Sequence, residues 1–120
     1  MYESRIYVFN RVEITKPGTD QVIDIVGNQL AVIDLAAAGG IKHLFHTPID
    51  FDVYHSDGDT VIKADCYGDT LKSAPIQTVI DWLEEMVKND SYRRYPPILS
   101  FLKALDPSLW DDLVCVHYGY

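Results

Sequence analysis

The start of the chain carries the hydrophobic pattern of a β-strand. Apolar and charged side chains alternate through residues 2–14, with Ile6 and Val8 among the apolar positions. This period of two is typical of a strand with one buried face. Tyr7 and Phe9 do not fit the pattern, because they are aromatic residues at odd-numbered positions, where the other side chains are mostly charged.

The following stretch is expected to form two more strands, over residues 21–26 and 29–36. Valine and isoleucine dominate both segments, and β-branched residues favour strands. Leu30, Ile33 and the alanines that follow also fit a helix, so the second segment leaves that alternative open. Gly39-Gly40 marks the break after it.

The dipeptide Asp57-Gly58 predicts a β-hairpin in the middle of the chain. A type I′ turn needs positive φ at both central positions, and this pair is among the strongest short signals for one. With these two residues as the loop, Val53 faces Ile62 on a mostly apolar face. Asp52 then faces Lys63 on the other face as a pair of opposite charges.

From Ser73 onward the period changes to that of helices. Apolar side chains recur three and four residues apart over 74–89, which predicts an amphipathic helix capped by Ser73. A second helix is expected to begin at Pro96-Pro97, because proline is tolerated in the first turn, and to end at Asp106-Pro107. The closing letters LVCVHYGY indicate a final strand.

The order of elements predicts the fold class. Strands come first, then two helices, then one strand, which indicates an α+β fold with a mainly antiparallel sheet and both helices packed on one face. The 120 residues have the size of one ordinary domain, so we expect a single domain over 1–120.

Charge narrows the classes of partner. The chain has 18 acidic and 10 basic residues and a formal net charge of −8. Such a surface repels phosphate backbones, so direct nucleic-acid binding is not expected. It attracts proteins with a basic surface and speeds their encounter. The alternative is that the charge only keeps a small domain in solution.

Cysteine usage and apolar run lengths predict the compartment. Cys66 and Cys115 are far apart and have no CxxC spacing, which fits a reduced, intracellular setting. No apolar run approaches the roughly 18 residues that a membrane span needs. We therefore expect a cytoplasmic protein without a membrane segment.

Three histidines raise the question of a metal site. His43 and His46 are three residues apart, but the flanking Gly39-Gly40 and Thr47-Pro48 leave little room for the helix that would aim both at one ion. His55 falls at the hairpin end, and Asp50 or Asp52 would have to complete the site. Loop and strand-end histidines are the simpler interpretation, so neither a metal nor another cofactor is expected.

The remaining candidates for catalysis are weak. Cys115 and His117 share a face of the last strand, where neighbours two residues apart point roughly parallel about 7 Å apart, too far for a thiol to be activated directly. The acidic pairs Glu84-Glu85 and Asp111-Asp112 are sequence neighbours, as on a solvated face. No residue is assigned a catalytic role.

Two surface features indicate partner binding. The hairpin and the first helix would form an acidic flank if they face the same side, and its members are Asp57, Asp59, Asp81, Glu84 and Glu85. The segment YRRYPP between the helices supplies residue types enriched at binding hot spots, namely Tyr92, Arg93, Arg94 and Tyr95. The alternative for these arginines is local pairing with the chain's own acids. Tyr118 and Tyr120 would add to such a patch if exposed.

The phrases YESRIY, DCYGD, YRRYPP and VHYGY, spread over the whole chain, resemble small uncharacterised acidic proteins of phages and mobile elements of Gram-positive bacteria. The resemblance implies a setting in which small acidic proteins bind and block a host macromolecule. It supplies no activity, cofactor or catalytic residue.

The leading hypothesis is a non-enzymatic interaction module that binds and inhibits a basic, nucleic-acid-handling protein. A small metal-dependent hydrolase using the region of His43 and His46 is the second hypothesis, and a homo-oligomeric structural component is the third.

Overall fold

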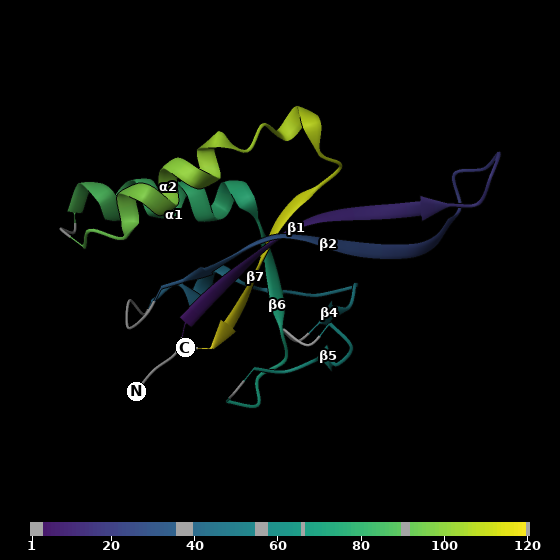
Figure 1. Cartoon of the computed structure of the whole chain (residues 1–120), viewed down its shortest axis with the longest axis horizontal. Helices are drawn as coiled ribbons and strands as arrows, with labels where there is room; N and C mark the ends of the chain where they lie inside the picture. The colour runs from purple at the N-terminus through teal and green to yellow at the C-terminus, as the bar shows by residue number, and fades with distance from the viewer. Residues whose placement is uncertain (1–3, 36–39, 55–57, 66, 90–91, 120) are drawn as a thin grey trace.

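A computed structural model describes residues 4–35, 40–54, 58–65, 67–89 and 92–119 of the chain (Figure 1). A five-stranded sheet has the strand order β2-β1-β7-β6-β3, with every pairing antiparallel. Two helices cover one face, and a two-stranded sheet of β4 and β5 lies on the other (Figure 1). The predicted α+β class is thereby confirmed. The strands are β1 (Ser4–Thr15), β2 (Val22–Asp34), β3 (Thr47–Pro48), β4 (Val53–Tyr54), β5 (Val61–Ile62), β6 (Lys72–Pro75) and β7 (Leu113–Gly119); the α-helices are α1 (Ile76–Asn89) and α2 (Tyr95–Ala104); the 3-10 helices are η1 (Lys42–Leu44) and η2 (Pro107–Leu109).

Strand β1 is buried on both faces, which explains its two exceptions to the alternating pattern. Ile6 and Val8 pack into a core beneath the helices. Tyr7 and Phe9 point to the opposite face, where they pack into a second core with Phe51 of the segment leading into β4. The prediction of one buried face was therefore wrong, because the sheet has a layer on each side.

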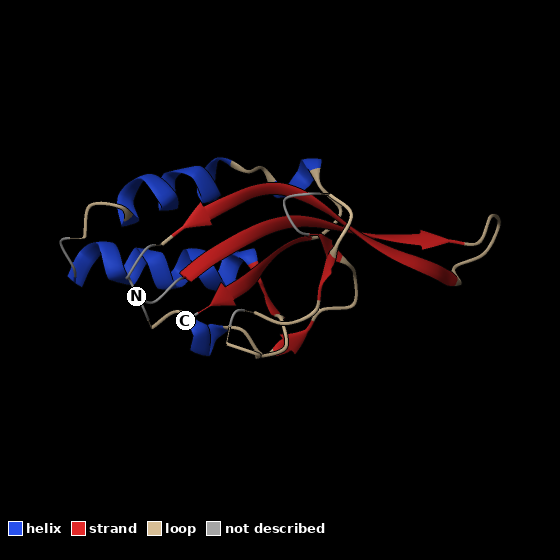
Figure 2. Cartoon of the chain, turned by 60° about the horizontal axis from the view of Figure 1, so that its bottom comes forward, coloured by secondary structure: helices blue, strands red, loops and turns tan. Residues whose placement is uncertain are grey.

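Strand β2 runs unbroken from Val22 to Asp34, so the expected division into two strands was wrong. Gly27 sits inside it, and the Phe51 ring lies against the space where a side chain would be. The outer part of the β1–β2 hairpin extends away from the body (Figures 1 and 2). We call this projection, from Arg11 to Ile25, the β-arm.

The base of the β-arm is fixed by Arg11. Its guanidinium donates from Nε to Asp50 Oδ1 at 2.9 Å and forms ion pairs with Glu13 at 3.0 Å and with Asp112 at 3.7 Å. The neighbouring Asn10 side chain accepts hydrogen bonds from the backbone N–H groups of residues 111 and 112. These contacts tie β1 to the loop before β4 and to the start of β7.

The helices follow the predicted periodicity with shifted ends. α1 begins at Ile76, because Ser73 belongs to β6 and is not a helix cap; its hydroxyl donates to the Thr47 carbonyl at 3.3 Å. α2 begins one residue before the two prolines, and the chain leaves the helix at Leu105, just before Asp106-Pro107. No helix in the described residues is long and apolar enough to cross a membrane.

The predicted hairpin register is confirmed where the strands are described, since Val53 pairs with Ile62. The strands are shorter than expected, with two residues each. Asp52 and Lys63 line the same hollow beside the hairpin, as this register implies, but the described residues show no ion pair between them. Asp57, at the predicted turn, lies outside the described residues, as does His55.

Candidate binding cleft

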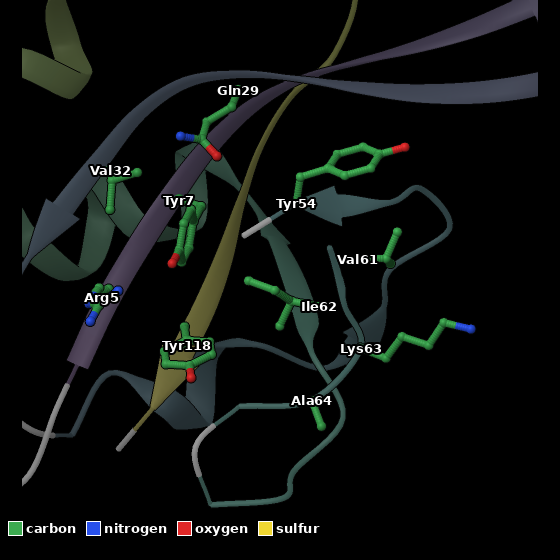
Figure 3. Close-up of a pocket in the computed structure, with 10 residues that line it drawn as sticks. All are labelled: Arg5, Tyr7, Gln29, Val32, Tyr54, Val61, Ile62, Lys63, Ala64 and Tyr118. Carbon is green, nitrogen blue, oxygen red and sulfur yellow. The ribbon is translucent and has the colours of Figure 1, made fainter. Parts of the chain in front are cut away.

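A large hollow lies between the sheet and the β4–β5 hairpin, on the face opposite the helices (Figure 3). It has a volume of about 790 Å³, within the range of ligand and peptide sites. We call it the cleft. It is lined by Arg5, Tyr7, Gln29, Val32, Tyr54, Val61, Ile62, Lys63, Ala64 and Tyr118.

Strand geometry places the floor of the cleft. Arg5 and Tyr7 are two residues apart on β1, so both point to the hairpin side. Their register partners across the ladders, Tyr118 on β7 and Val32 on β2, share that face. The Arg5 guanidinium lies 5.6 Å from the centre of the Tyr118 ring, a cation–π geometry, and the Tyr7 and Tyr118 rings meet edge-on at 6.3 Å.

The hairpin forms the opposite wall. Ile62 packs against the second core, and the next two residues, Lys63 and Ala64, line the rim of the cleft. The Tyr54 side chain, on β4, is 47% exposed. In Figure 3, Ile62 faces the two floor tyrosines, whereas Lys63 extends outward at the mouth.

The charged residues among the described lining of the cleft are basic, although the chain as a whole is acidic. The lining includes two cations, three phenol groups and one amide, and the described lining residues include no carboxylate. Asp34 is the register partner of Arg5 but does not line the cleft. The faces of phenol rings bind flat groups, and a guanidinium binds anionic groups. In the cleft, both lie next to an apolar wall that excludes water.

The predicted acidic flank does not form, so this expectation was wrong. Asp59 lies on the hairpin side of the sheet, whereas Asp81, Glu84 and Glu85 lie on α1 on the other side (Figure 1). The helix acids also have local partners. Glu84 is 3.2 Å from Lys103, Glu85 is 3.8 Å from Lys88, and Asp81 accepts a hydrogen bond from Gln77 at 2.8 Å.

The predicted tyrosine and arginine anchors are mostly built into the fold. Tyr95 is only 2% exposed and packs in the core, so its expected role as a surface anchor was wrong. Tyr92 is half-buried and donates to the Leu35 carbonyl at 3.3 Å. Arg94 donates to the Asp34 carbonyl at 3.0 Å, which ties the start of α2 to the end of β2. Arg93 is exposed.

Among the described residues, the histidines are not part of a metal-binding cluster. His43 lies in η1, and His46 precedes β3; both are exposed. Asp50, one of the two aspartates that could have completed such a site, is held by Arg11, which keeps the pKa of its carboxyl below the usual range. Within the described ranges, no three His, Cys, Asp or Glu side chains converge to hold a metal ion.

The Cys115 and His117 pair is part of the core. Cys115 is fully buried, and burial raises the pKa of its thiol to about 12. His117 is 5% exposed, its Nε2 lies 3.0 Å from the Ser4 hydroxyl, and its ring packs 5.3 Å from that of Phe45. Ser4 is itself 1% exposed, so this serine and histidine form a buried link between β1 and β7.

Sequence reasoning missed most of the cleft. The only sequence signal for the floor of the cleft was Tyr7, an aromatic residue among charged positions of the strand. Tyr118 was considered only as an addition to the patch around Tyr92–Tyr95. Tyr120 lies outside the described residues.

Comparisons with protein-family models, curated proteins and solved structures give no match to this chain.

Proposed function

We propose that the protein is a protein-interaction module that holds a segment of a partner in the cleft. The observation that carries this proposal is the lining, in which three tyrosines and two cations gather within a chain of net charge −8. Tyrosine and arginine dominate binding hot spots because they combine a large contact area with a polar tip. Phenols, an amide and cations hold and orient groups, which supports binding over catalysis as the function.

The charges favour a partner with two kinds of surface. Arg5 and Lys63 favour a carboxylate on the inserted segment. Outside the cleft, the acidic surface of the chain favours a partner that is basic overall. The narrower proposal, inhibition of a basic nucleic-acid-handling protein, draws its support from this net charge alone.

The test is capture of a partner by variants of the cleft. The tagged wild-type protein is used to recover a partner from the native host, and the purified partner is then titrated against single variants. Tyr54→Ala removes an exposed side chain of the cleft, and Tyr67→Ala is the matched control, because Tyr67 is 46% exposed but does not line it. A hot-spot loss of about 2 kcal/mol predicts roughly thirtyfold weaker binding for Tyr54→Ala and no change for the control.

Reversing the charge of Lys63 at the mouth of the cleft tests the electrostatic contribution to partner binding. Lys63→Glu is expected to weaken binding, and added salt should narrow its difference from wild type, because exposed charges are screened. Unchanged affinity in both Tyr54→Ala and Lys63→Glu would rule out the cleft as the binding surface.

A further inference from the structure

The outer edge of β2 has no strand beside it among the described residues, and only its end, at the Asp34 carbonyl, is held by Arg94. β2 is the first strand in the sheet order and pairs only with β1, although it has 13 residues. Sheet edges are commonly protected by lysine, proline or several charges. Between Val22 and Val32, this edge carries Asp24 as its one charged residue. An edge with so little protection is a template for a further strand.

The β-arm leaves apolar side chains without cover. Val22 and Ile23 of the arm are 41% and 57% exposed, and Ile14 on the facing strand is 41% exposed. Val32, beyond the arm on the same strand, is 46% exposed. The arm extends beyond the layers of the body in both views (Figures 1 and 2). An isolated two-stranded ribbon is marginally stable in water, so a neighbour along its edge would stabilise it.

The pattern of β2 is self-complementary about Gly27. Val22 and Val32 lie at equal distances from it in sequence, and their β1 partners, Thr15 and Tyr7, place both on the hairpin face of the sheet. Facing residues of an antiparallel pair share a face, and a two-fold axis through Gly27 satisfies this condition for both valines.

We propose that a second copy of this chain pairs antiparallel along β2, with Gly27 opposite Gly27 and Val22 of each copy opposite Val32 of the other. The β-arm of each copy then lies along the body of its partner, and the two sheets join into one. In this arrangement the arm of the second copy passes beside Val32 at the rim of the cleft.

The extent of the pairing is sufficient for a specific dimer. The facing stretch spans about eleven positions, and β2 has an irregularity at Leu30 and another at Ile23, near the two ends of that stretch. The ladder therefore supplies roughly five to ten hydrogen bonds, within the range of a typical interface. The two Asp24 carboxylates stand three positions either side of the axis, which separates them by roughly 20 Å at about 3.3 Å per residue. That distance exceeds the Debye length of about 8 Å at physiological salt, so their repulsion is screened.

Sedimentation of the whole chain over about 1 μM to 1 mM tests the proposal. Wild-type protein is expected to move from monomer to dimer in this range, and Val32→Lys to weaken the association at least about tenfold, because two lysines enter the ladder. Val87→Lys is the matched control, since Val87 is 36% exposed on α1, away from β2, and should dimerise as wild type does. Circular dichroism confirms that each variant is folded.

A pair of opposite charges tests the register. Val22→Asp and Val32→Lys should each dimerise poorly alone, and an equimolar mixture should form the heterodimer, because the carboxylate introduced in one copy then faces the ammonium group introduced in the other. A wild-type chain that stays monomeric at 1 mM, or one whose dimer survives Val32→Lys, would overturn the proposal. Failure of the mixture to associate would overturn the register about Gly27.

Discussion

Replacing Gly27 with alanine tests the packing between β2 and the second core. Glycine inside a strand ordinarily costs about 0.5–1 kcal/mol relative to alanine, so propensity alone predicts that Gly27→Ala stabilises the protein. The structure predicts the opposite. A Cβ at this position would lie 2.9 Å from Phe51 Cγ and 2.6 Å from Cε2, well inside van der Waals contact.

The size of the effect follows from what can move. Phe51 is 6% exposed and packs on Phe9, with ring centres 5.0 Å apart, so the ring cannot swing into solvent without leaving the core. Overpacking of this kind costs about 1–3 kcal/mol. Subtracting the propensity gain leaves an expected loss of roughly 0.5–2 kcal/mol in the free energy of unfolding.

Urea denaturation followed by tryptophan fluorescence measures the loss as a lower midpoint with an unchanged slope. Asn28→Ala, on the exposed neighbouring position, is the control for the change to alanine. In a Phe51→Leu background, Gly27→Ala should cost less, because the smaller side chain leaves room for the methyl group. If Gly27→Ala were as stable as wild type or more so, the packing of Phe51 against β2 would be refuted.

Two further predictions concern titratable groups. Arg11 lowers the pKa of Asp50 in the folded state, so the stability from this pair is present above the unfolded pKa of about 3.9 and is lost as pH falls below it. The urea midpoint of wild type should therefore fall between pH 5 and pH 3, and Arg11→Ala should reduce that fall. An unchanged fall would exclude Asp50 as a contributor. Cys115, with its buried thiol and raised pKa, should resist a disulfide reagent at pH 8 in the folded Cys66→Ser variant and react once urea unfolds it; rapid labelling of the native protein would contradict its burial.

The sequence predicted best what depends on local pattern. The 3.6-residue period over 74–89 located α1, and Ile76, Val79, Ile80 and Leu83 of its predicted stripe are buried as expected. Val87, the last member of that stripe, is exposed. The Asp57-Gly58 signal set the pairing of Val53 with Ile62. Both follow from neighbours in sequence, and the antiparallel sheet with helices on one face followed from the order of these elements.

The predictions that failed depended on how distant segments meet. The acidic flank required the β4–β5 hairpin and α1 to cover the same face, and no local pattern states which face an element covers. Ser73 and Tyr95 have residue types typical of a helix cap and a surface anchor, yet packing places the first in β6 and the second in the core. The cleft gathers Arg5, Tyr118 and Ile62 from three separate strands, so its residues show no spacing in the sequence.

We propose that this chain holds a segment of a partner protein in the cleft on the hairpin side of its sheet. Hydrogen exchange measured by mass spectrometry, on the chain alone and bound to the partner recovered from its host, tests this claim most directly. We expect slower exchange on binding in β2 and in the segment from β4 to β5, with α1 and α2 unchanged. Protection confined to the two helices would contradict the account.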